Sequence, residues 1–301
     1  MKLCDNMHLT VGIYGDQELA KKLGKKGTIN DIAIYNHGSS EGIFTYVCPN
    51  SDKIQTLLQT LGMIDVPVIV VKNLTKEIGE IIIAVDEMNF PYGFIIGNNG
   101  IEKIIKNTSL EKFSFVSEEH LWQELLKLNI ERSGPLNIPI DNYFNVKGVG
   151  TVILGIIKSG IVKKYDKVMV EPIGKEVVVK GIQSQDKDYD EAEPGTRVGL
   201  NLKGIDVDEL KRGYVICNKI KKSTNLKIKF KKSRFCKELK QGMPIFVAVG
   251  LQVVASTIES ISNDNLIIKI NSPIAYFENQ KCIIASQTET LPRVIGSGII
   301  E

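Results

Sequence analysis

Hydrophobic and polar positions follow one pattern in the first 134 residues of the chain and another in the remainder. The front part alternates short, continuous apolar runs, typical of strands buried on both faces, with helical stripes. Helical spacing covers residues 52–61, with Ser51 as the expected N-cap, and residues 117–128, with Ser117 as the N-cap. These repeated βα units predict an α/β domain with a mainly parallel sheet. We expect strands over residues 9–14, 32–35, 43–47, 66–71, 93–96 and 113–116.

The pattern changes at Arg132-Ser-Gly-Pro135, and the sequence beyond this point has no long helical stripe. Short β-branched runs follow, separated by Gly, Pro, Asn and Asp, with a second break near residues 218–224. Strands at this spacing are typical of β-barrels or sandwiches. The predicted fold class is therefore multidomain, α/β plus all-β. The expected domains are residues 1–134, 135–222 and 223–301.

Composition excludes several classes of protein. The 301 residues are 43% hydrophobic and 24% charged, as in a globular protein, and no apolar run reaches the roughly 18 residues of a membrane-spanning helix. The five cysteines are widely spaced without a C-x-x-C pair, which disfavours a disulfide framework and a zinc site. The three histidines are scattered, and no nucleophile–base or paired-carboxylate pattern stands out. We therefore expect a cytoplasmic protein with no catalytic residue and no metal site.

Charge is distributed unevenly among the three expected domains. The first carries 13 basic and 17 acidic residues, a net charge of −4. The second has 15 basic and 12 acidic residues, and the third has 10 and 6, giving net charges of +3 and +4. An acidic front and a basic rear are compatible with a polyanionic partner for the rear domains.

Turn motifs in the rear domains occur in a familiar order. Residues 138–217 contain Gly-x-Gly-Thr at 148–151, Ser-Gly at 159–160, Pro-Gly at 194–195 and Arg-Gly at 212–213. This segment closely resembles the second domain of the translational GTPases, the elongation factor Tu family. Residues 225–300 resemble the family's third domain in its selenocysteine-specific SelB variant, through residues 227–230, 242–250 and 293–298. The resemblance implies a P-loop-GTPase-like α/β domain followed by two antiparallel β-barrels.

The same resemblance implies a phosphate loop, G-x-x-x-x-G-K-[ST], near the start of the chain. Gly15 fills the first position, but Ala20, Lys21 and Lys22 fill the sixth, seventh and eighth. The Ala20 methyl crowds the backbone that should wrap the phosphates, and a second ammonium at Lys22 cannot replace the hydroxyl that binds Mg²⁺. The sequence therefore predicts a degenerate phosphate loop at these four positions.

The other nucleotide motifs also depart from the family pattern. Tyr35-Asn-His-Gly38 stands where we expect D-x-x-G, after the strand at residues 32–35. Lys72-Asn-Leu-Thr75 stands where N-K-x-D should follow the strand at residues 66–71, and it has no Asp to read guanine. Three departures together predict a pseudo-GTPase that has lost GTP turnover and needs no cofactor.

A basic run follows the second break. Between Lys219 and Lys240 lie ten basic residues and one acid, Glu238. A strand there places Lys227, Lys229 and Lys231 on one solvent face, with Lys232 and Arg234 next in the chain. A phosphate-tracking RNA surface and an edge strand guarded by lysines both fit this pattern. The family resemblance, whose barrels hold tRNA, favours RNA.

The resemblance also places Arg197 and the Gly-x-Gly-Thr segment near the family's pocket for the aminoacylated 3′ end of tRNA. Taken alone, the Gly-x-Gly-Thr segment is better explained as a turn of the barrel, and Arg197 as an ordinary surface arginine.

The sequence as a whole indicates a translation elongation factor-like protein that binds tRNA or the ribosome without hydrolysing GTP. Two alternatives stay open. One is a working GTP-binding factor in which Lys21 and main-chain N–H groups hold the phosphates, with Mg²⁺. The other is a regulatory scaffold for another translation-factor protein. Neither a membrane nor DNA is an expected partner.

Overall fold

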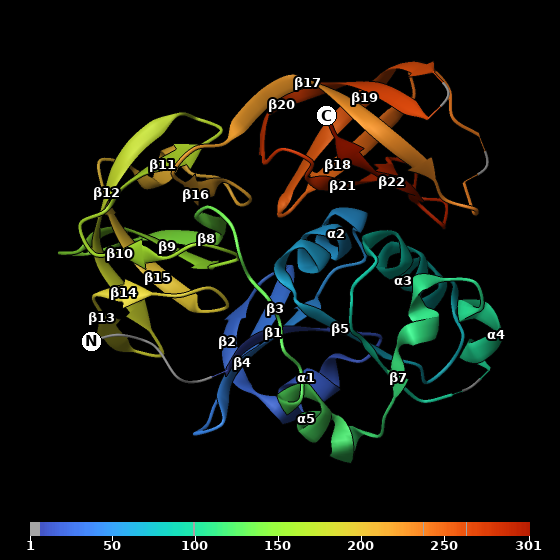
Figure 1. The fold of residues 1–301 in the computed structure, drawn as a ribbon, viewed down its shortest axis with the longest axis horizontal. Helices are drawn as coiled ribbons and strands as arrows, with labels where there is room; N and C mark the ends of the chain where they lie inside the picture. Colours follow the sequence, from blue (N-terminus) through green and yellow to red (C-terminus); the bar gives the residue numbers. More distant parts are fainter. Residues whose placement is uncertain (1–6, 99, 237, 263) are drawn as a thin grey trace.

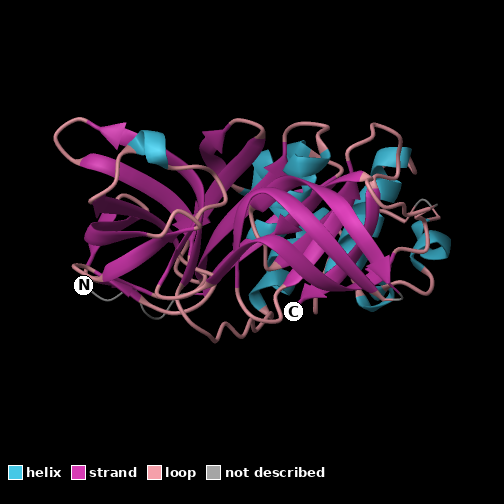
Figure 2. Ribbon diagram, turned by 90° about the horizontal axis from the view of Figure 1, so that it is seen from above, coloured by secondary structure: helices cyan, strands magenta, loops and turns pink. Residues whose placement is uncertain are grey.

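The computed structural model describes residues 7–98, 100–236, 238–262 and 264–301. An α/β domain is followed by two β-barrels, and the three pack side by side (Figure 1). Helices gather in one half of the molecule, whereas the other half is almost wholly strands (Figure 2). The predicted fold class is confirmed.

Domain 1 contains a seven-stranded sheet in the order β2-β3-β4-β1-β5-β6-β7. The pairs from β4 through β1, β5 and β6 to β7 are parallel, and β2–β3 and β3–β4 are antiparallel. The sheet is mainly parallel, as predicted. Its strands are β1 (Met7–Tyr14), β2 (Lys25–Ile29), β3 (Ile32–Gly38), β4 (Gly42–Pro49), β5 (Val66–Val70), β6 (Phe94–Ile96) and β7 (Ser114–Phe115).

Five helices cover this sheet: α1 (Gln17–Leu23), α2 (Ile54–Met63), α3 (Lys76–Met88), α4 (Ile101–Ile105) and α5 (Glu118–Leu126). A short 3₁₀ helix covers Ser109–Lys112. Ser117 caps α5 by position, as expected, but α2 begins after Lys53 and not after Ser51. Ser51 instead accepts a hydrogen bond from the Lys53 amide, so its hydroxyl shapes the turn that precedes the helix.

Domain 2 is a six-stranded closed antiparallel barrel, made by β8, β9, β15, β12, β11 and β16. The Gly-x-Gly-Thr segment forms its β8–β9 turn, where Gly148 and Gly150 have φ of 80° and 100°. The strands are β8 (Asn137–Val146), β9 (Gly150–Ile156), β10 (Val162–Lys163), β11 (Lys167–Glu171), β12 (Lys175–Ser184), β13 (Lys187–Tyr189), β14 (Glu191–Ala192), β15 (Arg197–Lys203) and β16 (Val215–Cys217).

Domain 3 is the second closed barrel, in the order β17-β20-β19-β18-β21-β22. Its strands are β17 (Lys221–Lys232), β18 (Pro244–Val249), β19 (Gln252–Ser262), β20 (Asn265–Tyr276), β21 (Lys281–Ser286) and β22 (Val294–Ile300). β17 begins at Lys221 and pairs within this barrel, so its first two residues fall in the range expected for domain 2.

Domains 1 and 3 share one hydrophobic core, which joins α2 and α3 to β18, β21 and β22. The two helices lie between the sheet and the barrel (Figure 1). The backbones approach so closely that a Cβ on Gly62 would lie 2.2 Å from the Gly250 carbonyl oxygen. The Glu80 carboxylate, 3% exposed, accepts hydrogen bonds from Arg293 at 2.5–3.1 Å. Burying a charge this deeply requires such a partner, and this pair links domain 1 to domain 3.

Asp65 joins domain 1 to domain 2. Its carboxylate lies 2.7 Å from the Arg132 guanidinium and 3.0 Å from the Lys158 ammonium. Burial alone would raise the pKa of Asp65, but the two cations hold it below its usual value. A second link joins Arg212 of domain 2 to Asp31 of domain 1 at 2.7 Å.

Candidate functional site

The turn between β1 and α1 lies where the phosphate loop is expected, but it is too short to wrap a phosphate. β1 ends at Tyr14 and α1 begins at Gln17, so Gly15 and Asp16 alone separate them. Gly15 has φ +92°, and a Cβ there would lie 2.3 Å from the Val70 carbonyl oxygen. The fold therefore requires glycine at this position because β5 passes close to the turn, whether or not a ligand binds.

A carboxylate of the chain itself, Asp16, lies at the N-terminus of α1. Asp16 is the N-cap of α1, and its side chain accepts a hydrogen bond from the Glu18 amide at 3.1 Å. The Lys72 ammonium, just beyond β5, lies 2.6 Å from the other Asp16 oxygen. Burial opposes ionisation of Asp16, but Lys72 and the Glu18 amide hold its pKa below the usual value. An anionic ligand would thus meet a carboxylate that is already charged and paired.

The remaining phosphate-loop positions lie away from this turn. Ala20 is fully buried in the domain 1 core, and Lys21 and Lys22 form the last turn of α1. Lys21 pairs with Glu18 at 2.5 Å, and Lys22 pairs with Glu118 at 3.0 Å. The three positions at which the sequence predicts the later part of a degenerate phosphate loop therefore lie within α1.

The expected place of the D-x-x-G motif was wrong. β3 runs antiparallel to β4, so Tyr35-Asn-His-Gly38 lies at the sheet edge opposite the β1–α1 turn. β4 is the parallel neighbour of β1, and its end lies at the same edge as that turn. The end of β4 and the residues just after it, Val47-Cys-Pro-Asn-Ser51, therefore lie at the edge where the motif is expected, and this segment contains neither Asp nor Gly. Val47 is fully buried and cannot hold Mg²⁺.

The guanine-reading position also lacks its carboxylate. Lys72-Asn-Leu-Thr75 follows β5, and Thr75, the N-cap of α3, stands where N-K-x-D has its Asp. Lys72, the first residue of this segment, pairs with Asp16. The residues at this sheet edge therefore do not fit GTP and Mg²⁺. Sequence reasoning missed the Asp16–Lys72 pair, although an Asp just before a helical segment is a recognised N-cap signal.

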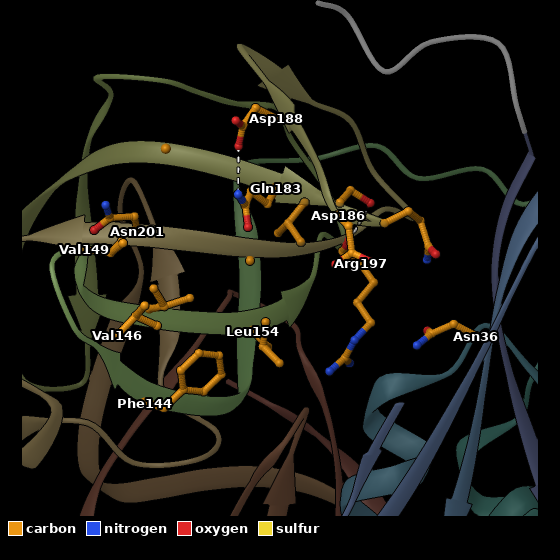
Figure 3. A pocket seen from close by; sticks show the side chains of 16 residues that line it. Asn36, Phe144, Val146, Val149, Leu154, Gln183, Asp186, Asp188, Arg197 and Asn201 are labelled. Carbon is orange, nitrogen blue, oxygen red and sulfur yellow. Dashed lines mark hydrogen bonds between the residues drawn. The ribbon is translucent and has the colours of Figure 1, made fainter. Parts of the chain in front are cut away.

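A cavity of about 630 Å³ opens on domain 2 beside domain 1 (Figure 3). Phe144, Val149 and Leu154 form its apolar part, Asp186 and Asp188 its acidic side, and Asn36 of β3 faces it from domain 1. Gln183 donates a hydrogen bond to Asp188 at 2.9 Å. This arrangement suits a ligand with an apolar portion and a cationic group.

Arg197 lines this cavity, and its side chain is held by a partner. Its guanidinium makes two hydrogen bonds to Asp141, at 2.6 and 3.0 Å, and both side chains are at least 90% buried. A bidentate pair of this kind fixes the Arg197 side chain at the cavity wall.

The basic run of domain 3 forms β17, and the predicted alternation is present. Leu226, Ile228 and Phe230 are buried, whereas Lys227, Lys229 and Lys231 are exposed on one face. Lys227 pairs with Glu301. Among the described residues, no ion pair joins Lys229 or Lys231 to a carboxylate.

β17 borders a groove of about 610 Å³, whose charged lining residues are Lys229, Lys231, Lys232, Lys281 and one acid, Asp264. Lys281 was not predicted. It comes from β21, donates to the Met88 carbonyl of domain 1 at 3.0 Å, and has its pKa lowered by burial. Arg234 lies elsewhere, with its guanidinium near the Ile104 and Lys106 carbonyls of domain 1. Lys237 lies outside the described residues.

Comparison with known proteins agrees with this architecture. The family model of elongation factor Tu domain 2 matches residues 150–217, and that of the C-terminal region of initiation factor eIF2 gamma matches residues 217–300. A selenocysteine-specific elongation factor of Methanocaldococcus jannaschii is 32% identical over 260 residues, which cover 81% of this chain. The chain belongs to the translational GTPase family. It spans 52% of that relative's length.

One relative has nearly the same length as this chain. An uncharacterized protein of M. jannaschii is 36% identical over 305 residues, covering 96% of this chain and 98% of its own. Among solved structures, SelB of Methanococcus maripaludis with a GTP analogue has a TM-score of 0.84 at 23% identity, covering 99% of this chain and 80% of that one. At that identity, the structural likeness shows the shared fold. None of the described helices is long and apolar enough to cross a membrane.

Proposed function

We propose that this member of the translational GTPase family is an elongation-factor-like protein that binds tRNA or the ribosome without binding or hydrolysing GTP. The Asp16–Lys72 pair carries the proposal. In this pair the Lys72 ammonium and the Glu18 amide already bind the Asp16 carboxylate, at the edge of the sheet where a nucleoside triphosphate would have to bind. No cofactor is required, and the protein acts in the cytoplasm.

RNA is the favoured partner because two features of the barrels match it. The lysines of β17 form one exposed face that can follow a phosphate backbone. The domain 2 cavity combines apolar side chains with Asp186 and Asp188, which suits an aminoacyl group whose free amine is cationic. A regulatory scaffold for another translation-factor protein would need neither the lysine face of β17 nor the cavity of domain 2.

Equilibrium titration with a fluorescent GTP analogue tests the claim that the protein does not bind GTP. We expect no saturable, Mg²⁺-dependent binding by the wild type at millimolar nucleotide. Lys72→Ala and Lys21→Ala are matched variants, because each removes one ammonium group. Lys72 lies beside the β1–α1 turn, and Lys21 lies in the last helical turn of α1. Saturable, Mg²⁺-dependent binding by the wild type would contradict the proposal. Its loss in Lys21→Ala would establish the alternative in which Lys21 holds the phosphates, and its loss in Lys72→Ala alone would place the nucleotide at the β1–α1 turn.

Affinity for tRNA, measured at several salt concentrations, tests the claim that the lysines of β17 bind RNA phosphates. Replacing Lys227, Lys229 and Lys231 with Ala should flatten the log–log salt slope by roughly two to three units, because each neutralised phosphate contributes slightly under one. A control variant with Ala at Lys76, Lys103 and Lys127 of domain 1 should keep the wild-type slope. Absence of tRNA and ribosome binding by the wild type would favour the scaffold.

A further inference from the structure

An exposed tyrosine on domain 2 occupies a backbone position that favours glycine. Residues 163–166 form a tight turn in which the Asp166 amide donates to the Lys163 carbonyl at 3.1 Å. Tyr165, the third residue, has φ +72°, whereas Lys164 is not among the residues with positive φ. This is the pattern of a type II turn, whose third position is normally Gly or Asn. The other described non-glycine residues with positive φ are all Asn, Asp or Gln.

The turn is held firmly against the barrel. The Tyr165 amide donates to the Val179 carbonyl at 2.7 Å, and the Val179 amide donates to the Asp166 carbonyl at 3.0 Å. The Asp166 carboxylate also accepts from the Lys163 amide at 2.7 Å. The strained backbone is therefore fixed by its surroundings, and backbone strain of this kind is concentrated at functional positions.

The Tyr165 ring has water around it and two ammonium groups beside it. Tyr165 is 64% exposed, more than any other large hydrophobic residue among those the structure describes. The ammonium groups of Lys164 and Lys180 lie 5.2 and 5.9 Å from the ring centroid. Lys180 lies where the β12–β15 pairing shifts register, between Val179 and Gly181. Within the described part of the chain, no carboxylate lies within ion-pair distance of either lysine.

From this geometry we propose that Tyr165, Lys164 and Lys180 form a second RNA-binding surface, which stacks an unpaired base on the Tyr165 ring. An aromatic face accepts any base, and the two flanking ammoniums can bind the adjoining phosphates. Exposed Lys–aromatic contacts are weak, so an incoming base can displace the lysines from the ring. This surface lies in domain 2 and is independent of the β17 lysines.

Binding of a fluorescein-labelled 12-nucleotide oligo(U), compared with a blunt 12-base-pair RNA duplex, tests the proposal. The wild type should prefer the single strand, because a duplex has no free base to stack. Tyr165→Gly should weaken oligo(U) binding by roughly 5- to 150-fold, the range that corresponds to one base stacked on an aromatic ring. Tyr165→Phe should retain the affinity.

Two controls separate this surface from folding and from general electrostatics. Tyr165→Gly should not lower the melting temperature, because glycine relieves the positive-φ strain. Tyr92→Gly, which removes a 42% exposed tyrosine from domain 1, should leave oligo(U) binding unchanged. Equal oligo(U) affinity in wild type and a folded Tyr165→Gly variant, or no wild-type preference for the single strand, would overturn the proposal and point to a protein ligand for the ring.

Discussion

Several buried ionisable side chains lie at the contacts between the domains of this protein. His8, at the start of β1, contacts the Arg132 guanidinium through its backbone carbonyl, at 2.8 Å. Burial, followed by the nearby positive charge of Arg132, lowers the pKa of the His8 imidazole from 6.5 to about 4. The folded protein therefore keeps His8 neutral at pH values where the unfolded chain binds a proton.

This shift predicts a pH dependence of stability. Between pH 6.5 and about 4 the unfolded state binds more protons, so stability is fully present above pH 6.5 and falls as the pH drops toward 4. We expect the wild-type melting temperature to fall more between pH 7 and pH 5 than that of His8→Gln. Parallel pH profiles for the two proteins would show that His8 does not titrate as described.

Arg293 provides a second test at the residue scale. Arg293→Ala leaves the buried Glu80 carboxylate without its partner, and such losses typically cost about 3–5 kcal/mol. Urea unfolding should show this decrease, with Arg293→Lys intermediate. If Arg293→Ala unfolded at the wild-type midpoint, the link between domains 1 and 3 would contribute no stability.

At the scale of elements, the β1–α1 turn consists of Gly15 and Asp16 alone, so the later phosphate-loop positions lie inside α1. The double variant Ala20→Gly, Lys22→Thr restores the consensus types at two phosphate-loop positions. We expect it to gain no GTP binding, because both positions lie inside α1, and to lose roughly 1 kcal/mol for glycine in a helix. Nucleotide titration and melting curves measure both effects. Saturable GTP binding by this variant would mean that α1 unwinds to form a loop.

Elements also show what could be predicted from sequence. The β17 alternation of Lys and apolar residues placed Lys227, Lys229 and Lys231 correctly, because a two-residue period determines which side chains face water. The turn motifs identified the barrels because tight turns with positive φ, as at Gly148 and Gly150, require glycine at fixed positions. The D-x-x-G position was misplaced because strand order is a long-range property: β4, not β3, lies beside β1. The Asp16–Lys72 pair and Lys281 depend on contacts between distant segments, which no local pattern reveals.

At the scale of the whole molecule, the domains form one connected body. Domains 1 and 3 share a core, and Asp65 and Asp31 join domain 1 to domain 2. Among the described residues, the sheet edge that would sense a γ-phosphate carries Val47 and the Asp16–Lys72 pair. We therefore expect these interfaces to stay closed whichever nucleotide is present.

The affinity for tRNA in the absence of nucleotide, with GDP and with a non-hydrolysable GTP analogue tests this account most directly. One titration series with aminoacylated and deacylated tRNA, at fixed salt and Mg²⁺, is sufficient. The account predicts measurable tRNA binding with the same Kd in all three nucleotide conditions. A Kd that tightens at least tenfold with the GTP analogue alone would contradict it, because that change requires a nucleotide site and a switch that responds to it.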